Sequence, residues 1–281
     1  MFLAKKSLGQ HFLTDESYLR MIVDALYLKP TNTKKSRAIK SPDLLMARTF
    51  PMCVEIGPGK GSLTAELLSR GHNVIALEKD RRLVPVLQEK FAQEIASRQL
   101  HIIEIDALDF SPDAWRLMPG AYSVIGNIPY YITGALLQKF LTGETPPSTV
   151  VFLVQKEVAE RIARAKKESI LSLSVKAYGT PVYVKTIPAG AFSPPPKVDS
   201  AILAITGISR KNFTNADHEK RFFELIHAGF AHKRKLLVRN LELIFDKNAP
   251  AALTAAHIPE KARAEDVSLE QWLVLAKEKI V

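Results

Sequence analysis

The sequence is short of several features, and each shortage narrows the class of protein. It holds a single cysteine, Cys53, so no disulfide can form within the chain, and a reducing, cytoplasmic setting is expected. No apolar run reaches the ~18 residues that a membrane helix needs. The N-terminus lacks the long apolar segment of a secretory signal, and no repeat period is visible. We therefore expect no membrane association.

Acidic residues are also scarce relative to basic ones. Lys and Arg number 39 against 29 Asp and Glu, which gives a net charge of +10. A basic balance of this size favours a polyanionic partner such as nucleic acid, although ordinary solubilising charge gives the same total. Apolar residues make up 47% of the chain, which is enough for a substantial core.

Short apolar runs alternate with helical patterns through most of the chain. This alternation predicts an α/β fold with a mostly parallel sheet and helices on both faces. No convincing strand follows residue 207, where the pattern becomes helical at 217–245 and 268–279. The sequence therefore predicts a sheet domain over 1–206 and a small helical domain over 207–281. The expected strands are 52–57, 73–78, 100–106, 122–127, 149–155, 181–188 and 200–206.

A glycine-rich loop follows the first strand of this alternation. Residues 54–64 are VEIGPGKGSLT, with Gly57, Gly59 and Gly61 between a strand and a helix. Glycine at such a turn lets the backbone approach a ligand closely. The loop is neither a phosphate-binding P-loop nor a dinucleotide fingerprint, because it lacks the Gly-Lys-Ser/Thr ending and the required glycine spacing. It predicts a nucleoside cofactor only weakly.

Polar residues at the ends of later strands strengthen this prediction. Glu78 ends the next strand, where a carboxylate can accept both hydroxyls of a ribose. Asp106 ends the strand after that, within reach of an adenine amino group. The carboxyl ends of parallel strands share one edge of the sheet, so Gly57, Glu78, Asp106 and Asn127 should line one site. Each acid taken alone would be an ordinary strand-end charge.

The residues GNIPYY at 126–131 suggest a reaction for this site, the transfer of a methyl group from a sulfonium to the N6 amine of adenine. The N6 amine of adenine is a poor nucleophile, and two acceptors can hold it: the side-chain oxygen of Asn127 and the carbonyl of Ile128. Pro129 restricts Ile128 to extended conformations, which fixes its carbonyl. Tyr130 offers a flat face on which a base can stack. A β-turn with a core tyrosine is the alternative.

Five segments in this order resemble a known family. They are GQHFL (9–13), EIGPGKGSLT (55–64), NIPYYIT (127–133), QKEVAERI (155–162) and AFSPPPKVDSAIL (191–203). Together they resemble the small-subunit ribosomal RNA adenine N6,N6-dimethyltransferases. The resemblance implies a Rossmann-like class I methyltransferase fold and S-adenosylmethionine as cofactor. It also implies two adjacent adenines near the 3′ end of 16S rRNA as the substrate, in a partly assembled small ribosomal subunit.

The resemblance also implies residue roles. Gln10, His11 and Leu13 would lie in a segment that folds over the cofactor, which would also touch Gly57 and Gly59. Glu78 would bind its ribose, Asp106 its adenine, and Asn127 would touch both cofactor and target. Phe192 would stack on the target adenine opposite Tyr130, although a core aromatic is the alternative. The cofactor residues are Gln10, His11, Leu13, Gly57, Gly59, Glu78, Asp106 and Asn127, and no metal site is expected.

A basic stretch near the C-terminus is the candidate contact with RNA. Residues 230–241, FAHKRKLLVRNL, fall on the expected helix 217–245. The candidate residues are Lys233, Arg234, Lys235 and Arg239. Contact with phosphates and an ordinary solvated helix face explain them equally well. The basic segment 30–50 is longer than the resemblance predicts.

Other functions remain open from the sequence. A nicotinamide dehydrogenase would use the same sheet, but it requires the missing dinucleotide fingerprint. A methyltransferase that acts on large-subunit rRNA or DNA fits the same residues. A non-catalytic RNA-binding assembly factor is disfavoured by the intact Glu78, Asp106, Asn127 and Tyr130. Nothing in the sequence requires a dimer, so we expect a monomer.

Overall fold

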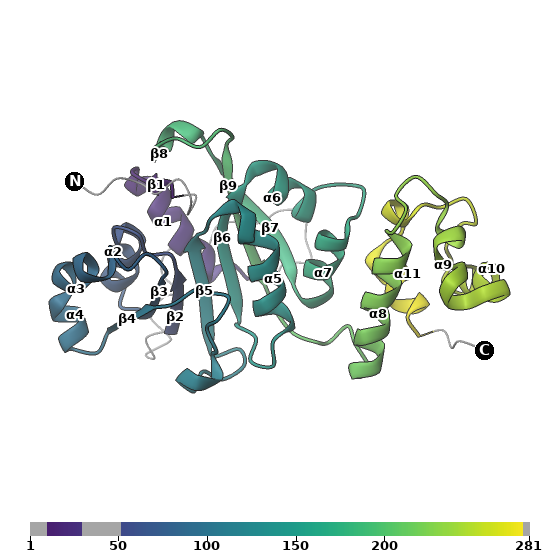
Figure 1. Cartoon of the computed structure of the whole chain (residues 1–281), viewed down its shortest axis with the longest axis horizontal. Coiled ribbons are helices and arrows are strands. Elements are labelled where there is room, and N and C mark those ends of the chain that lie inside the picture. Colours follow the sequence, from purple (N-terminus) through teal and green to yellow (C-terminus); the bar gives the residue numbers. More distant parts are fainter. Residues whose placement is uncertain (1–9, 30–51, 278–281) are drawn as a thin grey trace. The chain divides into compact units, whose positions relative to one another are not determined.

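The structure is a computed structural model that describes residues 10–29 and 52–277. The basic segment 30–50 singled out in the sequence falls outside the described residues. The chain divides into two compact units, one of residues 1–159 with 180–208 and one of residues 160–179 with 209–281 (Figure 1). The helical unit thus includes 160–179, which the sequence had assigned to the sheet domain.

The first unit is built on a seven-stranded sheet with the order β4-β3-β2-β5-β6-β9-β7. The five strands β4, β3, β2, β5 and β6 run parallel to one another, whereas β9 is antiparallel to both β6 and β7. The predicted mostly parallel sheet is therefore confirmed. The strands are β2 (Met52–Ile56), β3 (Asn73–Glu78), β4 (Leu100–Glu104), β5 (Tyr122–Asn127), β6 (Thr149–Gln155), β7 (Thr180–Ile187) and β9 (Ser200–Thr206).

Apolar residues along these strands explain the sheet. Nearly all residues of β6 and β9 are buried, as expected for strands with covered faces. One core cluster joins residues of all seven strands of this sheet to the apolar sides of α1, α2 and α3. The helices of this unit are α1 (Glu16–Asp24), α2 (Ser62–Ser69), α3 (Val84–Lys90), α4 (Ala92–Ala96) and α5 (Thr133–Thr142).

A second, two-stranded sheet ties the N-terminal segment to a loop far along the chain. Strand β1 (Phe12–Leu13) pairs antiparallel with β8 (Phe192–Ser193). Thr14 extends the pairing, because both its backbone N–H and its hydroxyl donate to the carbonyl of Ala191. Residues 10–14, called the N-terminal strap below, are therefore held against the loop before β9.

The second unit is helical. Trp272 is fully buried and is one of the largest side chains in its core. No helix in the described part of the chain is both long and apolar enough to cross a membrane. The helices of the second unit are α7 (Ile170–Tyr178), α8 (Ala216–Gly229), α9 (Leu237–Phe245), α10 (Ala249–Ala255) and α11 (Leu269–Leu275). The helix α6 (Lys156–Ala163) includes residues of both units.

The expected helix over 217–245 is wrong at residues 230–236. There α8 ends at Gly229, and a turn leads to α9. A β-carbon at Gly229 would collide with the ring of Trp272, so α8 packs closely on α11 at this point. The buried Asn240 donates to the carbonyls of Gly229 (2.5 Å) and His232 (3.2 Å), which fixes the turn.

Candidate active site

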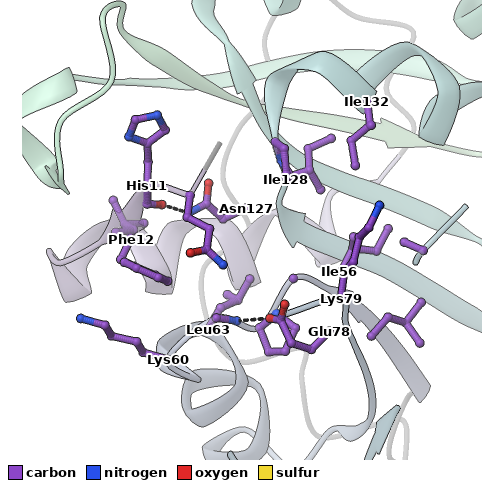
Figure 2. Close-up of a pocket in the computed structure, with 18 of the residues that line it drawn as sticks. His11, Phe12, Ile56, Lys60, Leu63, Glu78, Lys79, Asn127, Ile128 and Ile132 are labelled. Atoms are coloured by element: carbon purple, nitrogen blue, oxygen red, sulfur yellow. Dashed lines mark hydrogen bonds between the residues drawn. The ribbon is translucent and has the colours of Figure 1, made fainter. Parts of the chain in front are cut away.

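One cavity of about 340 Å³ lies at the carboxyl ends of the parallel strands. Its walls come from the N-terminal strap, the loop after β2, the ends of β3 and β5, and the turn after β5 (Figure 2). The sheet register explains this, since Ile56 at the end of β2 lies between Leu77 of β3 and Gly126 of β5. The residues that follow these three positions therefore meet at one edge.

The glycine loop requires glycine for two separate reasons. Gly57 and Gly59 have φ values of +67° and +61°, a left-handed conformation that other residues rarely adopt. A β-carbon at Gly59 would also lie 2.9 Å from the ring of Phe12 on the strap. The N–H of Gly57 donates to the carbonyl of Leu77 (2.9 Å), which anchors the loop on β3.

The Glu78 carboxylate is held by two backbone N–H groups. Oε2 accepts from Gly59 at 3.0 Å, and Oε1 accepts from Asp80 at 2.8 Å. Burial raises the pKa of Glu78, and these two bonds act in the opposite direction. Each oxygen keeps a lone pair beyond the bond that orients it, so the side chain is a preorganised double acceptor facing the cavity.

Asp106 lies on the same cavity wall in a different environment. Its carboxylate accepts from Lys79 Nζ (2.6 Å) and from the N–H of Leu108 (3.0 Å). The bond from Lys79 holds the pKa of Asp106 below its usual value. The side chain is 25% exposed, so it remains accessible as an acceptor despite the ion pair.

The N-terminal strap closes one side of the cavity. Gln10 donates to the carboxylate of Asp80 (3.1 Å), which Arg82 also binds. His11 donates from Nδ1 to the carbonyl of Pro194 (2.8 Å). Leu13 is buried and lines the cavity together with Gln10 and His11. The strap thus places all three residues at the wall of the cavity that the glycine loop also lines.

Asn127 joins the strap to the turn after β5. Its Nδ2 donates to the carbonyl of His11 at 2.7 Å, which defines the orientation of the amide (Figure 2). Oδ1 accepts no hydrogen bond from the described residues, and neither does the carbonyl of Ile128. Pro129 follows with φ −59° and ψ 132°. Two adjacent acceptors at the cavity wall are therefore available to a donor that enters it.

Tyr130 borders the same cavity and is fixed at its far end. Its hydroxyl lies 2.7 Å from Oγ of Ser200, the first residue of β9. Burial raises the pKa of Tyr130, so the phenol is neutral at physiological pH. Its ring lies nearly parallel to that of His11, with an interplanar angle of 19° and a centroid separation of 6.3 Å.

Phe192 lies apart from these residues. It is only 4% exposed, belongs to the main core cluster and does not line the cavity. Its pairing with Leu13 in the two-stranded sheet holds it there. This position matches the core aromatic that the sequence left as the alternative, and stacking on a target base would require the segment to rearrange.

The basic candidates lie in the helical unit and on a turn. Residues 231–236 are all exposed, and Lys233, Arg234 and Lys235 form no ion pair with the described residues. Arg239 lies on α9, where Glu242 binds it at 2.6 Å. Three of the four candidates are therefore free to meet an external anion.

Sequence reasoning missed residues that position the site. Ser200 anchors Tyr130, and Gly126 allows β5 to approach β2, because a β-carbon there would lie 2.6 Å from the carbonyl of Ile56. Asp80 and Lys79 orient Gln10 and Asp106. Gly126 directly precedes NIPY, so an unexplained glycine within a buried strand was a usable signal.

The comparison with known families identifies the family of the chain. The profile described as "Ribosomal RNA adenine dimethylase" matches residues 1–280. The chain belongs to the ribosomal RNA adenine dimethylase family. It is an enzyme, an adenine dimethyltransferase that acts on ribosomal RNA, and its α/β sheet is the Rossmann-like fold of that class.

Individual relatives agree with this family. A protein named ribosomal RNA small subunit methyltransferase A from Dehalococcoides mccartyi (strain CBDB1) is 39% identical over 279 residues, which is 98% of this chain and 88% of the relative. One of the same name from Acidobacterium capsulatum is 36% identical over 278 residues, or 96% and 89% of the two chains.

Two solved structures of other transferases show the same fold. The 23S rRNA methyltransferase ErmE aligns with a TM-score of 0.71 and 25% identity, covering 95% of this chain and 98% of its own. A dimethyladenosine transferase from Plasmodium falciparum aligns with a TM-score of 0.71 and 23% identity over 94% and 96% of the two chains.

Proposed function

We propose that this chain transfers methyl groups from S-adenosylmethionine to N6 of two adjacent adenines near the 3′ end of 16S rRNA. The product would be N6,N6-dimethyladenosine, formed during assembly of the small ribosomal subunit. The names of the relatives at 36–39% identity support this substrate. We also propose that the enzyme works as a monomer in the cytoplasm, where its substrate assembles.

The cavity residues fit a sulfonium nucleoside cofactor. S-adenosylmethionine, when bound, supplies an electrophilic methyl group. The two-point support of Glu78 suits a ribose with two hydroxyls, and Asp106 is placed to accept from an adenine amino group. The left-handed glycines leave room for close approach at the loop. The strap would cover the bound molecule and exclude water from it.

The orientation of Asn127 carries the proposal. Because Nδ2 is committed to the His11 carbonyl, Oδ1 is left to accept an N–H of the target amine. The carbonyl of Ile128 would accept the second N–H, and Tyr130 would stack on the base. Neither oxygen is a strong base at neutral pH, so these groups act by placing the amine and turning its lone pair out of the ring plane.

Phe192 remains a proposed stacking partner for the target adenine, on the condition that its segment rearranges and brings the ring out of the core. The helical unit, residues 209–281 with 160–179, is proposed to hold the RNA through the exposed turn 231–236. Such contacts with phosphates give affinity and register, whereas the choice of adenine depends on RNA shape and base flipping.

The second candidate is an enzyme that methylates adenine in large-subunit rRNA. The likeness to ErmE favours it, and the amine-holding residues would serve either RNA. Transfer of labelled methyl groups separates the two candidates. We expect a kcat/KM for unmodified small subunits far above that for deproteinised large-subunit RNA. The reverse order would assign the enzyme to the large subunit.

A further inference from the structure

The hydroxyl contact between Tyr130 and Ser200 joins the turn after β5 to the start of β9. The oxygens lie 2.7 Å apart, although the residues are 70 positions apart in sequence. Ser200 is fully buried, and its backbone pairs with Gln155 of β6 and Ile187 of β7. The far end of the tyrosine ring is thus attached to a buried residue that is paired on both sides within the sheet.

The backbone of Tyr130 lies in a short turn and not in the sheet. Tyr130 opens a three-residue 3₁₀ turn (Tyr130–Ile132) directly after Pro129. Such turns have poorer hydrogen-bond geometry than α-helices. A phenylalanine would offer the same stacking face but could not reach Ser200. The hydroxyl bond therefore fixes the position of the far end of the ring.

We propose that Ser200 is a positioning residue for methyl transfer, whose buried hydroxyl fixes the Tyr130 ring so that a stacked base presents its amine to Asn127. This inference rests on the proposed function of the site. It gives the tyrosine hydroxyl a function, whereas stacking alone would require only the ring. It also explains why a polar side chain begins strand β9, whose next five residues are apolar.

A purely structural role is the competing explanation. A buried hydroxyl needs a partner, and Tyr130 would simply satisfy Ser200. The two explanations differ in what the loss of the bond changes. A structural role lowers the melting temperature and leaves turnover intact, whereas a positioning role lowers kcat and leaves cofactor affinity intact.

A double-mutant cycle separates these explanations. Ser200→Ala, Tyr130→Phe and the double variant would be compared with the wild type for kcat, KM for RNA, cofactor Kd and melting temperature. Removing one neutral hydrogen bond should lower kcat by about three- to tenfold in each single variant. The double variant should match the single variants, because all three lack the same bond. Cofactor Kd should stay within about twofold, since no cofactor contact changes.

Ser123→Ala is the matched control. It removes a hydroxyl pair with Ser148 (3.3 Å) near the start of β5, away from the cavity, and kcat should not change. Additive losses in the double variant, or a kcat for Ser200→Ala equal to the wild type, would overturn the inference alone. A wild-type enzyme that methylates no adenine would overturn the proposed function and this inference with it.

Discussion

Glu78→Gln tests the cofactor site most sharply among single substitutions. The carboxylate accepts from the N–H groups of Gly59 and Asp80, one on each oxygen. Glutamine has one acceptor oxygen, so one of these N–H groups would face an amide NH₂ and the side chain would turn. The proposed charge-assisted bond to a ribose hydroxyl would also be lost, which costs about 1.5–3 kcal/mol. The Kd for S-adenosylmethionine should therefore rise about 10- to 100-fold.

Isothermal titration calorimetry with S-adenosylmethionine measures this directly. Glu104→Gln is the matched control, because Glu104 pairs with Glu78 in the sheet register, is exposed, and loses the same charge. Its Kd should stay within about twofold of the wild type, since the lost charge is solvent-screened. A Glu78→Gln variant that binds as tightly as Glu104→Gln would refute the assignment of this carboxylate to the ribose.

Three other perturbations have defined outcomes. Asn127→Ala should lower kcat about 100-fold through loss of an amine acceptor, and cofactor affinity only about fivefold through loss of the bond to the strap. Burial raises the pKa of Glu55 to about 8. The unfolded chain releases this proton near the usual glutamate pKa of 4.5, so stability should fall as pH rises from there to about 8, and Glu55→Gln should flatten that slope in thermal unfolding. Replacing residues 233–235 by Gln should weaken RNA binding and make its log–log salt dependence shallower by about 2.

Each of these outcomes has a control or a contradicting result. A fully active Asn127→Ala would exclude the amine-holding scheme, and an unchanged pH slope would show that Glu55 ionises normally in the fold. For the basic turn, the control replaces three exposed lysines of the same unit, and an equal loss of RNA affinity there would mean that only net charge matters. The control lysines are Lys211, Lys220 and Lys247.

The sheet was predictable because its strands are short buried runs. Val150 to Val154 of β6 are all apolar and fully buried, a pattern that local sequence shows directly. The sheet edge that gathers Gly57, Glu78 and Asn127 followed from the rule for parallel sheets, and the register confirms it.

The remaining features depend on contacts between distant residues. The break after Gly229 is set by Trp272 and Asn240, while the residues in the turn itself are good helix formers. An aromatic at position 192 suits either a core or a stacking face, and only its pairing with β1 places it in the core. A serine at position 200 carries no local signal that its hydroxyl binds Tyr130.

The most direct test of the central claim is the identity of the modified nucleoside. The enzyme would be incubated with S-adenosylmethionine and small ribosomal subunits that lack the modification, and the digested RNA examined by mass spectrometry. The account predicts new N6,N6-dimethyladenosine with the wild type and none with Asn127→Ala. Tight subunit binding without any methylated adenosine would contradict it and leave an RNA-binding assembly factor.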